Sequence, residues 1–147
     1  MIALQVGSDQ PNSVKGILSL EGWTNHHVAQ DAFQGNMYVT LSPAEKARDL
    51  EARRFATGHW NASQRSAFAQ IWKRWNGLEF LEQTEIPILE VYGDRGRAKR
   101  SREALRIPRR ENIQLRWILG ASHSLPLERP REVAQLMMEF IRRVESK

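Results

Sequence analysis

The sequence has no cysteine and no long run of apolar residues. The absence of cysteine from all 147 residues excludes disulfides, thiol nucleophiles and cysteine-ligated zinc. No window approaches the roughly 18 consecutive apolar residues that a membrane span needs. Residues 1–13 also lack the basic region and apolar core of a secretory signal. We therefore expect a cytoplasmic protein without a membrane partner, stabilised by a packed core.

What is present is the composition of one globular domain. Hydrophobic residues make up 41% and charged residues 27% of the chain, which excludes collagen-like, coiled-coil and disordered classes. The length fits a single domain as well.

The basic excess is concentrated in one segment. The formal net charge is +5, but residues 95–110 hold eight basic residues against one acidic residue, a net +7 that leaves −2 on the remainder. Surfaces that stack nucleic-acid bases need aromatic side chains among the basic ones, and this segment contains no aromatic residue. Residues 98–106 (AKRSREALR) have a helix-compatible sequence, so we predict a solvated helix face and no nucleic-acid partner.

Three short apolar runs have the pattern of buried strands. They are residues 14–20, 86–92 and 113–119, and each is closed by a loop that contains glycine. Two of them are followed by helical patterns. Buried strands that alternate with helices predict an α/β fold with a parallel sheet of about three strands and flanking helices.

Helix signals fill the space between the first two runs and the end of the chain. Ser42, Pro43 and Glu45 form a capping-box pattern that predicts a helix to about Thr57. Asn61 with Gln64 predicts a second cap, followed by an apolar stripe that ends at Gly77. A closing helix is predicted from Pro130, with apolar residues at helical spacing: Val133, Leu136, Met137, Phe140, Ile141 and Val144.

Two segments carry a resemblance to a known superfamily. Residues 120–130 (GASHSLPLERP) are similar to the segment of the α/β-hydrolases that holds the catalytic histidine. Residues 86–94 resemble the penultimate strand of the same fold. The resemblance implies one domain over residues 1–147 with a helical cap inserted at about 24–84. It also implies a hydrolase acting on an ester-type or related bond.

The resemblance covers only the C-terminal part of that fold. In the superfamily the nucleophile lies on a Gly-x-Ser-x-Gly turn that precedes the acid and the histidine, and this sequence has no such turn. Residues 1–6 resemble the tail of the helix that follows it. We therefore expect a truncated hydrolase that is inactive alone and lacks an N-terminal half. The alternative is a non-catalytic oligomeric interaction module derived from a hydrolase.

The resemblance assigns His123 as the general base and leaves two candidates for the acid that orients it. Many relatives carry an aspartate at the position that here is Gly96. Glu21 follows the first strand, as the acid does in the haloalkane dehalogenases, and Asp94 follows the second strand. We favour Glu21, because an aspartate in Gly-Asp-Arg-Gly is also a common turn former.

Two further groups of residues carry no predicted site. His26 and His27 adjoin the Glu21 loop, but adjacent histidines point apart, so we predict neither a metal nor a cofactor. Tryptophans at helical spacing favour a core role over pocket lining; these are Trp23, Trp60, Trp72 and Trp75. A three-stranded sheet cut from a larger one exposes an edge, so we predict a homo-oligomer, a dimer or higher, that buries this edge or the insertion helices.

Overall fold

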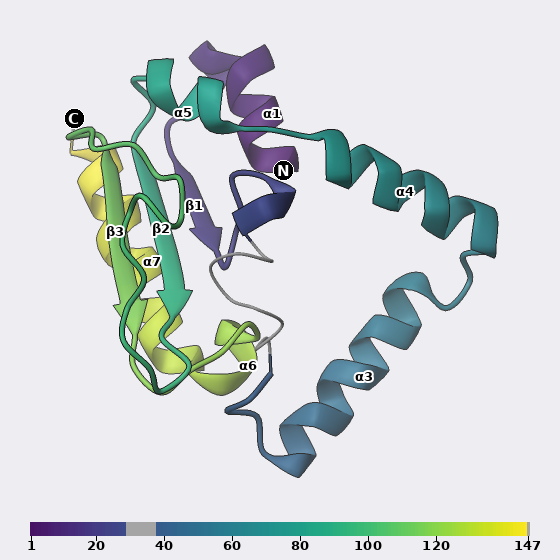
Figure 1. The fold of residues 1–147 in the computed structure, drawn as a ribbon. Coiled ribbons are helices and arrows are strands. Elements are labelled where there is room, and N and C mark those ends of the chain that lie inside the picture. Colours follow the sequence, from purple (N-terminus) through teal and green to yellow (C-terminus); the bar gives the residue numbers. More distant parts are fainter. Residues whose placement is uncertain (29–37, 147) are drawn as a thin grey trace.

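A computed structural model of the chain describes residues 1–28 and 38–146 (Figure 1). Three parallel strands form one sheet in the order β1-β2-β3. The strands are β1 (Ile17–Leu20), β2 (Ile88–Gly93) and β3 (Ile113–Ile118). In register, Ile17 pairs with Ile88, which pairs with Ile113. The predicted α/β class with three parallel strands is confirmed.

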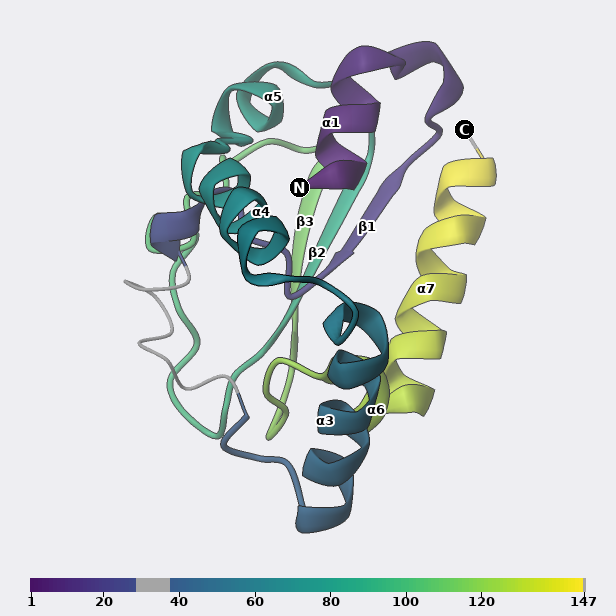
Figure 2. The same ribbon diagram turned by 90° about the vertical axis from the view of Figure 1, so that its right-hand side faces the viewer.

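Helices cover both faces of the sheet. Helix α7 (Pro130–Glu145) lies on one face, and α1 (Ile2–Asp9) with α5 (Leu78–Gln83) lies on the other (Figure 2). Because side chains alternate along a strand, β2 contributes Leu89 and Val91 to the core beneath α7. It contributes Ile88 and Tyr92 to the core beneath α1 and α5. The described short elements include a 3-10 turn, Pro11–Ser13, the helix α6 (Leu125–Glu128) and an isolated bridge between Asn25 and Asn76.

Two helices between β1 and β2 form an arm, which we define as residues 43–74. They are α3 (Pro43–Thr57) and α4 (Ala62–Arg74). Both predicted capping boxes are confirmed, at Ser42 with Glu45 and at Asn61 with Gln64. Neither helix contains a buried residue, and the arm projects away from the sheet (Figure 1). The capping boxes therefore set where these helices begin, because packing against the core does not stabilise them.

The predicted helix at residues 98–106 is wrong. The structure has turns there, and Arg106 adopts a left-handed φ of 50° that ends any helical continuation. Leu105 is fully buried, and Arg102 donates to the main-chain oxygens of Pro108 and Ile113, both at 2.9 Å. The segment is not a solvated helix face, because its leucine enters the core and this arginine bonds main-chain oxygens. None of the described helices has both the length and the apolar character that crossing a bilayer requires.

One acidic side chain lies inside the sheet's core. Glu90, at the centre of β2, is 1% exposed, and its Oε2 has no hydrogen-bond partner among the described residues. Burial raises the pKa of Glu90 to about 7, although a hydrogen bond with the Ser19 side chain opposes this shift. The folded state therefore favours the neutral acid.

We predict that this group makes stability fall as the pH rises from about 4.5 to about 7. Within this window the unfolded chain releases the Glu90 proton while the folded chain keeps it, so ionisation favours unfolding by up to about 3 kcal/mol. The Glu90→Gln variant should lose this slope in urea unfolding followed by circular dichroism. Glu51→Gln, on the exposed surface of α3, is the control and should keep it. Equal slopes in all three proteins would contradict the assignment.

Candidate active site

The loop after β3 places His123 at the carboxyl edge of the sheet, where β1 and β2 also end. Main-chain packing against Gly93 holds this loop. A Cβ atom at Gly93 would lie 2.2 Å from the carbonyl oxygen of Ala121 and 2.7 Å from that of Ser122. Only a glycine lets the loop lie directly on the end of β2, and this contact fixes the height of His123 above the sheet.

Glu21 reaches the histidine from the neighbouring strand end. Its Oε2 lies 3.4 Å from Nδ1 of His123. Glu21 follows β1 directly, has a left-handed φ of 53°, and is 4% exposed. The Gly93 N–H donates to its Oε1 at 2.6 Å. A non-glycine residue in this conformation is strained and persists only where its surroundings hold it.

Arg95 supplies the strongest of these restraints, a role that was not predicted from the sequence. Its guanidinium contacts Oε2 of Glu21 at 2.5 Å and Oε1 at 3.1 Å, and it also donates to the Gly93 carbonyl at 2.5 Å. The two side chains are 3% and 1% exposed. Arg95 has a left-handed φ of 59° as well. A buried bidentate pair of this kind fixes the orientation of a carboxylate.

Asp94, the second acid candidate, contacts the main chain of two turns. Its Oδ1 accepts from Gly96 N at 2.9 Å and from Gly120 N at 2.7 Å. Both glycines have positive φ, 66° and 63°. Among the described residues, no hydrogen bond joins Asp94 to His123. This carboxylate links the turn after β2 to the turn after β3, and Glu21 is the candidate acid that the structure brings to the histidine.

Glu128 is a second residue that sequence reasoning missed. This buried carboxylate accepts two contacts from Ser122 N, at 2.9 and 3.0 Å, and one from Ser122 Oγ at 2.8 Å. It also accepts from the hydroxyl of Thr40. On the other side of His123, Ser124 Oγ donates to Asp49 at 3.0 Å. Both serine hydroxyls next to the histidine therefore serve to hold its loop.

Among the described residues, aromatic rings lie against one face and one edge of the imidazole. Trp23 stacks on His123 with a centroid distance of 5.3 Å and an interplanar angle of 25°, and Tyr38 meets the ring edge-on at 5.8 Å. Trp72 of α4 continues the cluster, 5.5 Å from Trp23 and 4.4 Å from His26. The His123 side chain keeps 29% exposure. The aromatic residues restrict the tilt of the imidazole without closing it off from solvent.

The other histidines do not assemble a ligand set. Within residues 1–28 and 38–146, no three histidine, aspartate or glutamate side chains lie close enough to hold a metal ion. The rings of His26 and His27 are 6.0 Å apart and nearly perpendicular.

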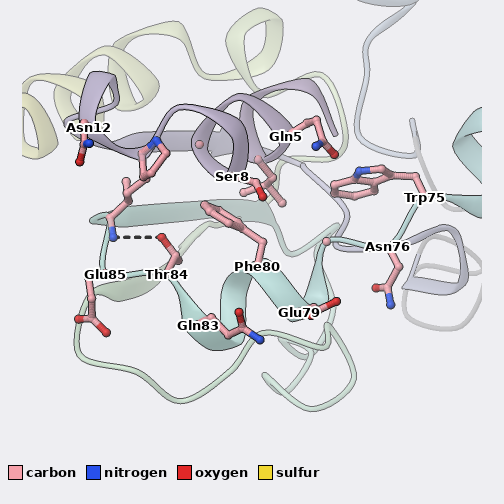
Figure 3. Close-up of a pocket in the computed structure, with 15 residues that line it drawn as sticks. Gln5, Ser8, Asn12, Trp75, Asn76, Glu79, Phe80, Gln83, Thr84 and Glu85 are labelled. Carbon is pink, nitrogen blue, oxygen red and sulfur yellow. Dashed lines mark hydrogen bonds between the residues drawn. The ribbon is translucent and has the colours of Figure 1, made fainter.

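Two cavities bear on the site: one lies beside the loop that holds His123, and the other lies away from it. A hollow of about 380 Å³ lies between α3 and α6, lined by Asp49, Ser124 and Pro126 among others. A cavity of about 780 Å³ lies between α1 and α5, where Trp75 and Phe80 project among mostly polar side chains (Figure 3). Neither His123 nor Glu21 lines the second cavity. Neither residue lines the first hollow either, which comes near the site only through Ser124, the residue after His123.

Comparison with solved structures gives the context of this site. The chain is similar to an α/β-hydrolase enzyme from the metagenome of sediments of the Mar Chica lagoon, Morocco, with a TM-score of 0.64 and 17% identity. The match covers 98% of this chain and 57% of that one. It is also similar to a membrane phospholipase A described as a bacterial virulence factor, with a TM-score of 0.68, 22% identity, and 99% and 55% coverage.

The chain thus spans just over half the length of the structures it matches. No family model matches the sequence, and no curated protein does.

We predict that Arg95→Met destabilises the protein by about 3 kcal/mol or more, because it leaves the Glu21 carboxylate buried without its partner. The double variant Glu21→Leu, Arg95→Met should recover most of this loss, since it removes both charges. Urea unfolding of the two single variants and the double variant measures the coupling. Additive losses would show that the two side chains act independently, against the geometry described above.

Proposed function

We propose that this chain, which has part of the α/β-hydrolase fold, carries the acid–base pair of a hydrolase acting on an ester-type or related bond. In this proposal His123 is the general base and Glu21 the carboxylate that orients it. The observation that carries the proposal is the 3.4 Å approach of Glu21 Oε2 to His123 Nδ1 at the carboxyl edge of the sheet.

The chemistry follows from the two nitrogens of the imidazole. With Nδ1–H directed at Glu21, Nε2 is free to accept the proton of an attacking hydroxyl. Glu21 then stabilises the imidazolium that forms, and Arg95 keeps the carboxylate from turning away. Trp23 stacks against the ring and restricts its tilt. Asp94 holds the turns beneath the site in this scheme.

The nucleophile comes from outside this sequence in our proposal. The hydroxyls of Ser122 and Ser124 already donate to Glu128 and Asp49. Acyl transfer also needs preorganised donors for the developing oxyanion, and losing one such donor lowers the rate by roughly 10²–10³. The chain covers just over half of the hydrolases it matches, which leaves room for a segment bearing both. The 147-residue chain is inactive alone in this proposal.

A second candidate is a non-catalytic oligomeric interaction module. It is favoured by surfaces that remain open in the described structure. Strand β1 pairs only with β2, so no described strand covers its outer edge. Helix α7 exposes three large apolar side chains, Met137, Met138 and Ile141. Both features fit a partner, either a second copy or the missing half of a hydrolase.

We predict that the 147-residue chain hydrolyses p-nitrophenyl acetate no faster than free imidazole, with or without His123→Ala. The reading frame extended upstream of Met1 should encode an in-frame Gly-x-Ser-x-Gly or Gly-x-Asp-x-Gly turn, and its product should turn over the ester. In that protein His123→Ala and Glu21→Gln should each lower kcat by about 10³ or more. Asp94→Asn serves as the comparison and should leave kcat within about tenfold, provided the variant is folded.

Two outcomes would contradict parts of this proposal. One is turnover by the short chain that disappears in His123→Ala, which would keep His123 as the base but place the nucleophile within these 147 residues. The other is a stop codon with a ribosome-binding signal directly upstream of Met1, which would favour the interaction module.

We predict a dimer or higher oligomer of the isolated chain in light scattering at micromolar concentration. The open β1 edge and the apolar α7 face stay in water in a monomer, which soluble proteins avoid. Met138→Lys should shift the equilibrium toward smaller species if α7 is buried between chains. A monodisperse monomer would contradict this prediction.

A further inference from the structure

The arm exposes apolar residues that neither core accounts for. Phe55, near the end of α3, is 88% exposed, and Ile71 and Phe68 of α4 are 60% and 46% exposed. Trp60, in the connection between the two helices, packs against Phe68 with a centroid distance of 5.4 Å. Aromatic residues therefore gather at the end of the arm farthest from the sheet, where α3 turns into α4 (Figure 1). We call residues 53–68 the arm tip.

The arm tip and the residues that follow it, up to residue 78, have charge of one sign. Residues 52–78 contain five basic residues and no acidic residue, which equals the net charge of the whole chain. Arg53 pairs with Asp49 and lies over the Tyr38 ring, and Arg65 donates to the Trp60 carbonyl. Within the described part of the chain, Arg54 and Arg65 form no ion pair with an acidic side chain. Their charge is available to an anionic partner.

Three classes of partner could cover such a surface. A second copy docking tip to tip would bring like charges together, which is unfavourable. Single-stranded nucleic acid binds in basic grooves that track its backbone, whereas the tip is a projection. Ile71, exposed on α4 beyond the tip, has no role in base stacking. Anionic lipid headgroups match the arginines, and the acyl boundary beneath them takes up phenylalanine, isoleucine and tryptophan.

We propose that the arm tip binds the surface of a bilayer containing anionic phospholipids, with Phe55, Trp60 and Phe68 entering the interface and the arginines contacting headgroups. This binding is peripheral, so it agrees with the absence of a spanning helix among the described ones. It revises the expectation of no membrane partner, which was based on the lack of a span. The proposal is independent of the hydrolase assignment, because the tip residues varied in its test, Arg54, Phe55 and Arg65, are not part of the candidate site.

The test is sedimentation of the full 147-residue chain with phosphatidylcholine vesicles, with and without phosphatidylglycerol. We expect binding only to the anionic vesicles, and its loss at about 0.5 M salt because salt screens the charges. Arg54→Gln with Arg65→Gln should weaken binding by about tenfold or more. Phe55→Ser should weaken it by about tenfold while leaving the charge unchanged.

Matched controls come from the body of the protein. Arg131→Gln with Arg142→Gln removes two exposed charges from α7, and Leu119→Ser removes an exposed apolar side chain that is 62% accessible. Neither control should change vesicle binding. Because the chain lacks cysteine, Ala62→Cys and Ala134→Cys each give one site for a polarity-sensitive dye. Only the dye at residue 62 should shift to the blue with anionic vesicles.

Several results would overturn the proposal. These are no binding to anionic vesicles, equal binding to neutral ones, or equal losses in tip and control variants with native circular dichroism. If the tip variants instead dissociate an oligomer in sedimentation velocity, the arm binds a second copy. If they abolish binding of single-stranded oligonucleotide and leave vesicle binding intact, nucleic acid is the partner.

Discussion

The buried pair between Glu21 and Arg95 is the interaction on which the carboxyl edge of the sheet depends. Two charges taken out of water are costly, and here each carboxylate oxygen is satisfied, by the guanidinium and by the Gly93 N–H. The pair also holds two strained left-handed residues at the ends of adjacent strands. The position of His123 follows from it, because its Nδ1 lies against the same carboxylate.

Local signals in the sequence were sufficient for the three strands and the two capped helices, whereas features that depend on distant contacts were not predicted. The capping boxes at Ser42 and Asn61 and the three apolar runs each involve a few neighbouring residues, and the structure has them as predicted. The role of Arg95 was not predictable, since its partner lies 74 residues away and its backbone conformation leaves no trace in the sequence. The prediction of a helix at residues 98–106 was wrong, because burial of Leu105 in the core outweighed the local helix propensity.

The choice between Glu21 and Asp94 shows the same limit. Both follow a strand and both suit a carboxylate's role, so only the packing of the loops separates them. Asp94 accepts from two turn glycines, whereas Glu21 lies beside the imidazole. Catalysis by Glu21 and His123 stays a prediction. The structure itself shows that the chain divides into a packed body and an arm whose helices contain no buried residue.

The long insertion between β1 and β2 also has a consequence for how the chain folds. Ile88 finds its β3 partner 25 residues later, whereas its β1 partner, Ile17, lies 71 residues earlier. Loop-closure entropy makes the second contact more costly by about 1 kcal/mol. The pairing of β2 with β3, which lies under α7, thus joins residues closer in sequence than the pairing of β1 with β2 does, and contacts of this kind form faster. This ordering favours β1 joining last, so that the strand with the open outer edge pairs only when β2 and β3 are already in place.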